Sequence, residues 1–196
     1  MKKTDIPKNI GDQVYKDEDF TKTSFAGHTF YNCTFENCNF TEASFEQANL
    51  MQCTFIRCNL SNTILRECQM EQILFKETKL VGLDFSVCDT ALLFSINAEE
   101  SFFDYCNFSS LELNGASFKK SEIHSSQFID SRLQQANFTE TDLAKTLFHH
   151  CDLREANFTG AINYMLNPCE NKLARAIFSF PECIGLLKAL DITIIQ

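Results

Sequence analysis

A large apolar residue recurs at every fifth position of the chain from Phe20 onward. A first run of fourteen such positions extends to Phe85, and a second run of twelve extends from Phe103 to Phe158; all twenty-six hold Phe, Leu, Ile or Met. A period of five fits neither an α-helix, at about 3.6 residues per turn, nor a flat strand, at about 2. A chain that points one large side chain inward every five residues must turn a corner each time, so the pattern predicts short extended segments joined by corners.

The position two residues before each large one completes the pattern. It holds Ala, Cys, Ser or Thr in twenty-one of the twenty-six units, and the residue between is often Asn or Asp. The clearest units read A-N-F-T-E at 136–140, C-D-L-R-E at 151–155 and A-N-F-T-G at 156–160. These units resemble the A(D/N)LXX motif of the pentapeptide-repeat proteins, and the resemblance covers about residues 18–163.

This resemblance implies the fold class, which is all-β: a right-handed quadrilateral β-helix. Four units form one square coil, the large and the small residue fill the interior, and the other three residues face solvent. Side chains twenty residues apart then stack, so that Phe20, Phe40 and Leu60 form one column. We expect about seven coils over 18–163, an N-terminal extension or cap over 1–17, and a C-terminal capping and dimerisation segment over 164–196.

The register of the repeat breaks at about 86–102. If Thr90, Leu93 and Ala98 are the centres of partial units, the frame moves by two residues, because Leu93 follows Thr90 after three residues instead of five. This predicts a kink or a small bulge between two stacked halves. An insertion or deletion tolerated at a corner and a specific binding loop are both open interpretations.

The last thirty-odd residues lack the clear repeat. Pro181 suits the first turn of a helix, after which Ile184, Leu187 and Leu190 recur on one face. The final residues, DITIIQ, alternate, with Ile192 and Ile194 on one side, and predict a short strand. Such a segment could simply close the core or join two copies end to end. It resembles the C-termini of the quinolone-resistance and microcin-immunity pentapeptide-repeat proteins, where this region makes the dimer, so the five apolar residues named here are the expected interface of a homodimer.

Catalytic chemistry and cofactors are not predicted. Eight of the ten cysteines occupy the small inward position, and no C-x2-C pair occurs, so we interpret them as reduced core thiols and not as metal ligands or a disulfide scaffold. His149 and His150 fall on outward positions. The sequence shows no G-x-S-x-G motif, no phosphate-binding glycine run and no nucleophile with an evident base.

The charge of the chain narrows the class of partner. The net charge is −9 and the sequence pI about 4.9, which argues against direct binding of nucleic acid through its phosphates. Residues 20–163 carry eighteen Asp and Glu against ten Lys and Arg, so the excess lies on the rod. No apolar stretch is long enough to cross a membrane, and no export signal is evident, so a bacterial cytoplasmic location is the expectation.

The resemblance also suggests a function. Quinolone-resistance and microcin-immunity members look like DNA, bind the type II topoisomerases DNA gyrase and topoisomerase IV, and protect them from poisons. On this hypothesis an acidic outer surface meets the basic DNA-binding channel of the enzyme through Glu99, Glu100, Asp104, Asp130, Glu140 and Glu155. The alternative is a structural or scaffold module for a different protein. A continuous negative stripe on the folded surface favours DNA mimicry, whereas a mixed surface favours the scaffold.

Overall fold

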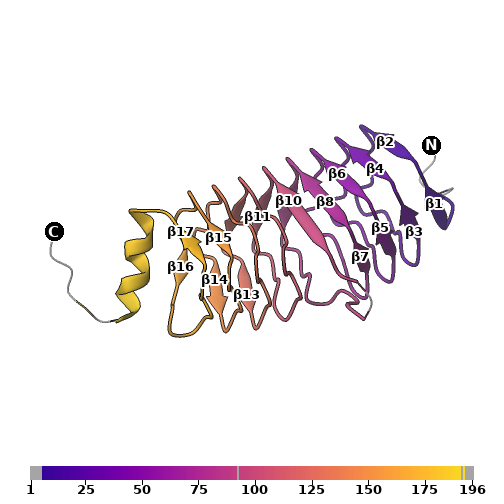
Figure 1. The fold of residues 1–196 in the computed structure, drawn as a ribbon. Coiled ribbons are helices and arrows are strands. Elements are labelled where there is room, and N and C mark those ends of the chain that lie inside the picture. The colour runs from indigo at the N-terminus through magenta and orange to yellow at the C-terminus, as the bar shows by residue number, and fades with distance from the viewer. Residues whose placement is uncertain (1–5, 92, 191, 193–196) are drawn as a thin grey trace.

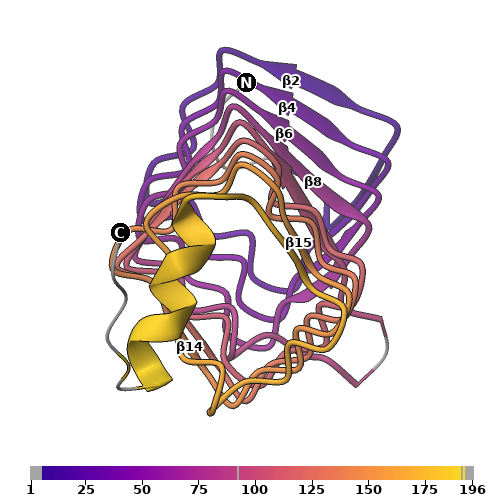
Figure 2. The same ribbon diagram turned by 60° about the vertical axis from the view of Figure 1, so that its left-hand side comes forward.

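The chain forms a four-sided β-solenoid of about eight turns with one short helix at its C-terminal end (Figures 1 and 2). This is a computed structural model, and it describes residues 6–91, 93–190 and 192. The predicted all-β fold class is confirmed. All pairing between strands is parallel, and most pairs join residues twenty apart, as for Phe35 and Phe55. Each strand therefore forms hydrogen bonds with the strands at the same position in the coils before and after it.

Five parallel sheets cover the sides of the rod. The first sheet contains β1 (Asn9–Gly11), β3 (Thr29–Tyr31), β5 (Asn49–Met51) and β7 (Gln69–Glu71). The second contains β2 (Val14–Lys16), β4 (Thr34–Glu36), β6 (Thr54–Ile56), β8 (Ile73–Lys76) and β10 (Ile96–Glu99). The third contains β9 (Lys79–Val81), β11 (Phe102–Asp104) and β12 (Glu122–His124). The fourth contains β13 (Gln127–Ile129), β14 (Leu147–His149) and β16 (Met165–Leu166), and the fifth β15 (Asn157–Phe158) and β17 (Ile177–Phe178).

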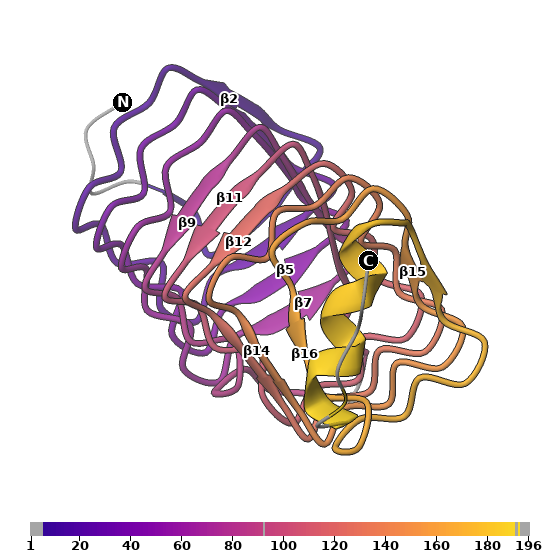
Figure 3. The same cartoon turned by 90° about the vertical axis from the view of Figure 1, so that its left-hand side faces the viewer.

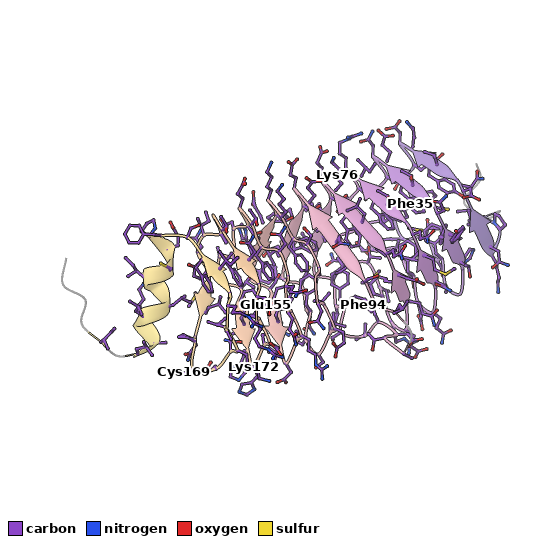
Figure 4. All side chains as sticks on the ribbon, viewed as in Figure 1. Phe35, Lys76, Phe94, Glu155, Cys169 and Lys172 are labelled. Carbon is purple, nitrogen blue, oxygen red and sulfur yellow. The ribbon has the colours of Figure 1, made fainter. Side chains whose placement is uncertain are left out.

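The interior is a continuous stack of the predicted large residues. All twenty-six are buried, with none more than 7% exposed. Rings in one column lie nearly parallel: the centroids of Phe118 and Phe138 are 5.3 Å apart with an interplanar angle of 7°, and those of Phe128 and Phe148 are 5.0 Å apart at 2°. Rings in neighbouring columns meet edge to face. The core therefore leaves no open lumen for a ligand, and Phe35 lies inside the rod while Lys76 points away from it (Figure 4).

The corners of the coil require an unusual backbone conformation. Among the residues that the structure describes, twenty-six that are not glycine have φ between 47° and 63°, and nearly all of them lie two residues after a large inward residue. Such a left-handed conformation costs an L-residue roughly 1–2 kcal/mol. The cost is offset by backbone hydrogen bonds between adjacent coils: the Gln52 N–H, for example, donates to the Glu71 carbonyl oxygen at 2.8 Å. Because every corner side chain points outward, the corners form regular rows along the rod.

The register break is an insertion of three residues, not a loss of two. Ile73 pairs with Ile96 and Lys79 with Phe102, an offset of twenty-three instead of twenty. Ala98 is 2% exposed and takes an inward place as predicted, but Leu93 is 67% exposed, so its assignment as a centre is wrong. The insertion lies between Asp89, which still pairs with Gln69 twenty residues before it, and Ile96. A local shortening is also tolerated, because Leu147 pairs with Met165 at an offset of eighteen.

The coil extends past both predicted boundaries. Before Phe20, Ile10 is buried and Tyr15 packs against the core, and their strands β1 and β2 already pair with β3 and β4. After Asn163, β16 pairs with β14 and β17 pairs with β15. Ile10 and Tyr15 keep the five-residue spacing ahead of Phe20, so the sequence contained a signal for the first coil.

The predicted C-terminal helix is a 3-10 helix, η1 (Glu182–Leu190), which lies across the last coil against β16 (Figure 3). With three residues per turn, Ile184, Leu187 and Leu190 fall on one face, as the sequence predicted. The predicted strand over DITIIQ lies outside the described residues except for Ile192, and so does Ile194.

Candidate functional site

The outer surface of the rod is the candidate functional site, because the interior is filled by side chains. No group of three or more His, Cys, Asp or Glu side chains is arranged to hold a metal ion within the described part of the chain. Among the same residues, no helix has the length and apolar character needed to cross a bilayer. Any chemistry of recognition therefore comes from the rows of outward side chains.

Many charged residues on these rows pair across adjacent coils. Residues twenty apart lie one above the other, so Lys16 reaches Glu36 at 2.8 Å and Arg132 reaches Glu112 at 3.2 Å. Arg57 contacts Glu36 from the other side at 2.5 Å. The pKa of the Glu36 carboxyl is lowered, first by the hydrogen bond from Lys16 and then by its positive charge. Opposite charges meet in these pairs, so the described surface is mixed, although like charges also lie side by side, as Glu122 and Asp142 do on adjacent coils.

The six predicted acidic residues behave in two ways. Four of them have a basic partner: Glu99 with Lys76, Glu100 with Lys120, Asp130 with His150, and Glu155 with Arg175. Asp104 and Glu140 have no ion pair among the described residues. Of the six, these two carboxylates are therefore the ones whose charge is least neutralised by a basic neighbour. Asp104 is the first residue after the inward Phe103 and Glu140 is the second after the inward Phe138, so both take outward positions of the repeat.

The inward polar residues are structural. The eight predicted core cysteines are buried and free, and burial is the main cause that raises the pKa of the Cys53 and Cys106 thiols to about 12. Cys169 is exposed and Cys183 is partly exposed. The buried hydroxyls donate to backbone carbonyls, either of the preceding coil, as the Thr141 hydroxyl does to Phe118 at 2.9 Å, or of their own coil, as the Ser126 hydroxyl does to His124 at 2.8 Å. These groups satisfy the backbone at corners and are not available as nucleophiles or ligands.

The two adjacent histidines point outward, as predicted. The rings of His149 and His150 stack with centroids 3.8 Å apart. His149 Nδ1 lies 3.1 Å from a carboxylate oxygen of Glu170, and His150 Nδ1 lies 3.4 Å from Asp130. Each imidazole therefore has its own carboxylate, which accounts for the pair without a catalytic role.

The C-terminal end carries exposed apolar side chains. Ile184, Leu187, Leu190 and Ile192 are between 38% and 54% exposed, and Phe180 is 79% exposed. Leu186 instead packs against the core, so η1 is anchored by one side and leaves the other uncovered. Burial raises the pKa of Tyr164, beside this helix, to about 12.

Two shallow grooves lie along one edge of the C-terminal half. One, of about 330 Å³, lies between the third and fourth sheets and is lined by Tyr105, Ser125, Gln127, Lys145 and Leu147. The other, of about 400 Å³, lies between β16 and η1. The sequence reasoning did not identify either, because residues forty apart become neighbours only when the coils stack.

Comparison with known families agrees with this geometry. The profile of the pentapeptide repeat region matches residues 28–95 and 101–171, and the five residues between the two matches directly follow the insertion. The chain belongs to the pentapeptide-repeat family. A search of curated protein sequences found no match.

Solved pentapeptide-repeat structures share the fold. A trypsin-treated form of QnrB1, a plasmid-mediated fluoroquinolone resistance protein, superposes with a TM-score of 0.54 at 16% identity, over 95% of this chain and 100% of that one. HetL, a pentapeptide-repeat protein involved in heterocyst differentiation regulation in the cyanobacterium Nostoc sp. strain PCC 7120, superposes with a TM-score of 0.53 at 17% identity, over 86% of this chain and 84% of that one. At these identities the likeness shows the fold, which two proteins of different biological role share.

Proposed function

We propose that this chain is a non-catalytic, protein-binding rod of the bacterial cytoplasm, and that a type II topoisomerase is its partner. The observation that carries the first part is the filled interior: every one of the twenty-six large residues is buried, so only stiff rows of outward side chains remain for recognition. A surface of this kind recognises another macromolecule by shape and charge.

Three features support a topoisomerase as the partner. The rod is long and narrow (Figure 1), it carries a net charge of −9, and it shares its fold with a fluoroquinolone resistance protein. A negative rod is attracted to a basic channel that normally holds DNA. On this proposal the protein occupies that channel of DNA gyrase or topoisomerase IV and protects the enzyme from a quinolone-like drug or a peptide toxin.

The paired charges limit how such a complex would form. Because the carboxylates of Glu100 and Glu155 already have basic partners, they contribute little to a long-range negative field. Asp104 and Glu140 lack such partners, so we expect them to contribute more to the rate of association. This mixed surface is also the observation that favours the alternative, a scaffold for a different protein.

A supercoiling assay tests the proposal. Purified gyrase is inhibited with a fluoroquinolone, with and without a titration of this protein, and binding is measured separately by surface plasmon resonance. We expect recovery of supercoiling, and a lower association rate for the double variant Asp104→Asn and Glu140→Gln than for the control Glu100→Gln and Lys120→Gln, which removes a whole ion pair and leaves the net charge unchanged. Absence of both binding and any effect on supercoiling for gyrase and topoisomerase IV excludes this partner and leaves the scaffold role.

We propose further that the chain is a homodimer through its C-terminal end. The exposed face of η1, formed by Ile184, Leu187 and Leu190, is apolar and has no cover within the described chain. Burying such a face against a second copy removes it from water. Sedimentation equilibrium should give a dimer for the native protein and a monomer for Leu187→Glu, with Leu93→Glu as a control of equal charge at the distant bulge. A native monomer excludes this arrangement.

A further inference from the structure

The edge between the third and fourth sheets carries a groove that none of the predicted acidic residues touches. Three successive coils place Tyr105, Ser125 and Lys145 at the same corner, since the Tyr105 N–H donates to the His124 carbonyl and the Ser125 N–H to the Ala144 carbonyl. All three residues have left-handed φ, between 47° and 61°, so their side chains leave the rod in one row. Serine is much smaller than its neighbours, and a notch results between tyrosine and lysine.

The groove has an apolar wall on its second side. Leu147 pairs with Gln127 in the fourth sheet and is 46% exposed, and Met165 continues the same row at 70% exposed. Tyr105 is 69% exposed and has no ring contact within the described chain. The Tyr105 ring and the Leu147 side chain are therefore exposed to solvent on two sides of the notch. Exposed apolar groups of this kind often form a site for one apolar side chain of a partner.

The groove holds an unpaired cation. Lys145 has no ion pair among the described residues, whereas most cations on the rod, such as Lys16 and Arg132, are paired with a carboxylate. Asp142, the nearest carboxylate on its own coil, is 3.4 Å from His124 instead. Asp104 precedes Tyr105 and is the other carboxylate close to this edge. The Lys145 ammonium, the Tyr105 phenol and the Ser125 hydroxyl can all donate hydrogen bonds, so together they fit a carboxylate.

We propose that this groove binds a protein segment in which an apolar side chain is followed by an acidic one. The apolar side chain enters the notch over Ser125, between Tyr105 and Leu147, and the carboxylate accepts hydrogen bonds from Lys145 and Tyr105. This surface selects an acidic partner, whereas the acidic rows would face a basic channel.

A titration with defined peptides tests the proposal on the full-length protein. The probe is a fluorescein-labelled peptide of alternating leucine and aspartate, and the comparison peptide alternates leucine and lysine. Fluorescence anisotropy should show binding of the first at least about tenfold tighter than the second. Backbone amide shifts in NMR spectra of the labelled protein should change at Tyr105, Ser125, Lys145 and Leu147 and not on the first sheet.

Matched variants locate the site. Tyr105→Ala and Lys145→Glu should each weaken binding about tenfold, a size usual for central contacts. Tyr31→Ala and Lys172→Glu, which make the same changes at exposed positions away from this edge, should leave the affinity unchanged. Equal binding of both peptides, no binding up to about 1 mM, or equal loss in the control variants overturns the proposal. Because gyrase takes no part in this titration, its result is independent of the topoisomerase assay.

Discussion

Replacing Phe128 by alanine should be among the most costly single substitutions in this protein. The ring is fully buried and stacks between Phe108, at 4.6 Å and 6°, and Phe148, at 5.0 Å and 2°. It also meets Phe118 and Phe138 edge to face at 5.9 Å and 6.0 Å. Loss of the buried apolar area costs about 1.5–3 kcal/mol, and each lost ring pair adds roughly 0.5 kcal/mol or more.

The expected loss in the free energy of unfolding is therefore about 4 kcal/mol, near the upper part of the usual range for Phe→Ala. The site cannot collapse to fill the cavity, because the perimeter of each coil is fixed by its ladders to the coils above and below. Urea denaturation followed by circular dichroism gives the value directly. Phe180→Ala, at a ring that is 79% exposed, is the control and should change stability by no more than about 0.5 kcal/mol.

A loss below about 1 kcal/mol for Phe128→Ala, with an unchanged urea dependence, would refute the reasoning. It would mean that neighbouring rings move into the space, so that the columns are not held in register by the backbone. Phe128→Leu should lower the free energy of unfolding by about half as much as Phe128→Ala, because leucine keeps part of the buried apolar area.

Three further predictions concern a corner, the thiols and acid stability. Gly82→Ala should destabilise the protein by at least about 1 kcal/mol more than Gly115→Ala, as measured by urea denaturation. Both glycines have φ near 71°, but an added Cβ at Gly82 would lie 2.6 Å from the Asn62 side-chain oxygen, whereas one at Gly115 would meet no atom within 4 Å. Equal losses for the two variants would mean that the Asn62 side chain moves to make room. In native protein, Ellman's reagent should react rapidly with Cys169 and not with the eight buried cysteines, and rapid reaction of more than two thiols would contradict the burial. The lowered pKa of Glu36 contributes stability that is present above its ordinary pKa of 4.5 and is lost as the pH falls through the lower folded-state value. In Glu36→Gln, the free energy of unfolding should therefore fall less steeply with decreasing pH in this acid range than in the native protein. An identical pH dependence for the two proteins would count against the ion pair.

The sequence by itself determined the coil, because one large apolar residue in five has few ways to be buried. Phe45, Leu60 and Phe138 lie inside as their spacing required, and the inward cysteines follow from the same lattice. The face of η1 that holds Ile184, Leu187 and Leu190 was also predictable, since spacing by three marks one side of a helix.

Only the tertiary structure decided how the outward residues combine. The pairing of Lys16 with Glu36, or the meeting of Tyr105 and Lys145 across Ser125, depends on which residues stack, and the three-residue insertion shifts that register for all later coils. The five-residue period determines which side chains point inward, because whether a side chain is buried depends only on its own position in the repeat. The surface depends on pairs of residues a whole coil apart, and so its charge pattern and its grooves emerge only when the coils are in contact.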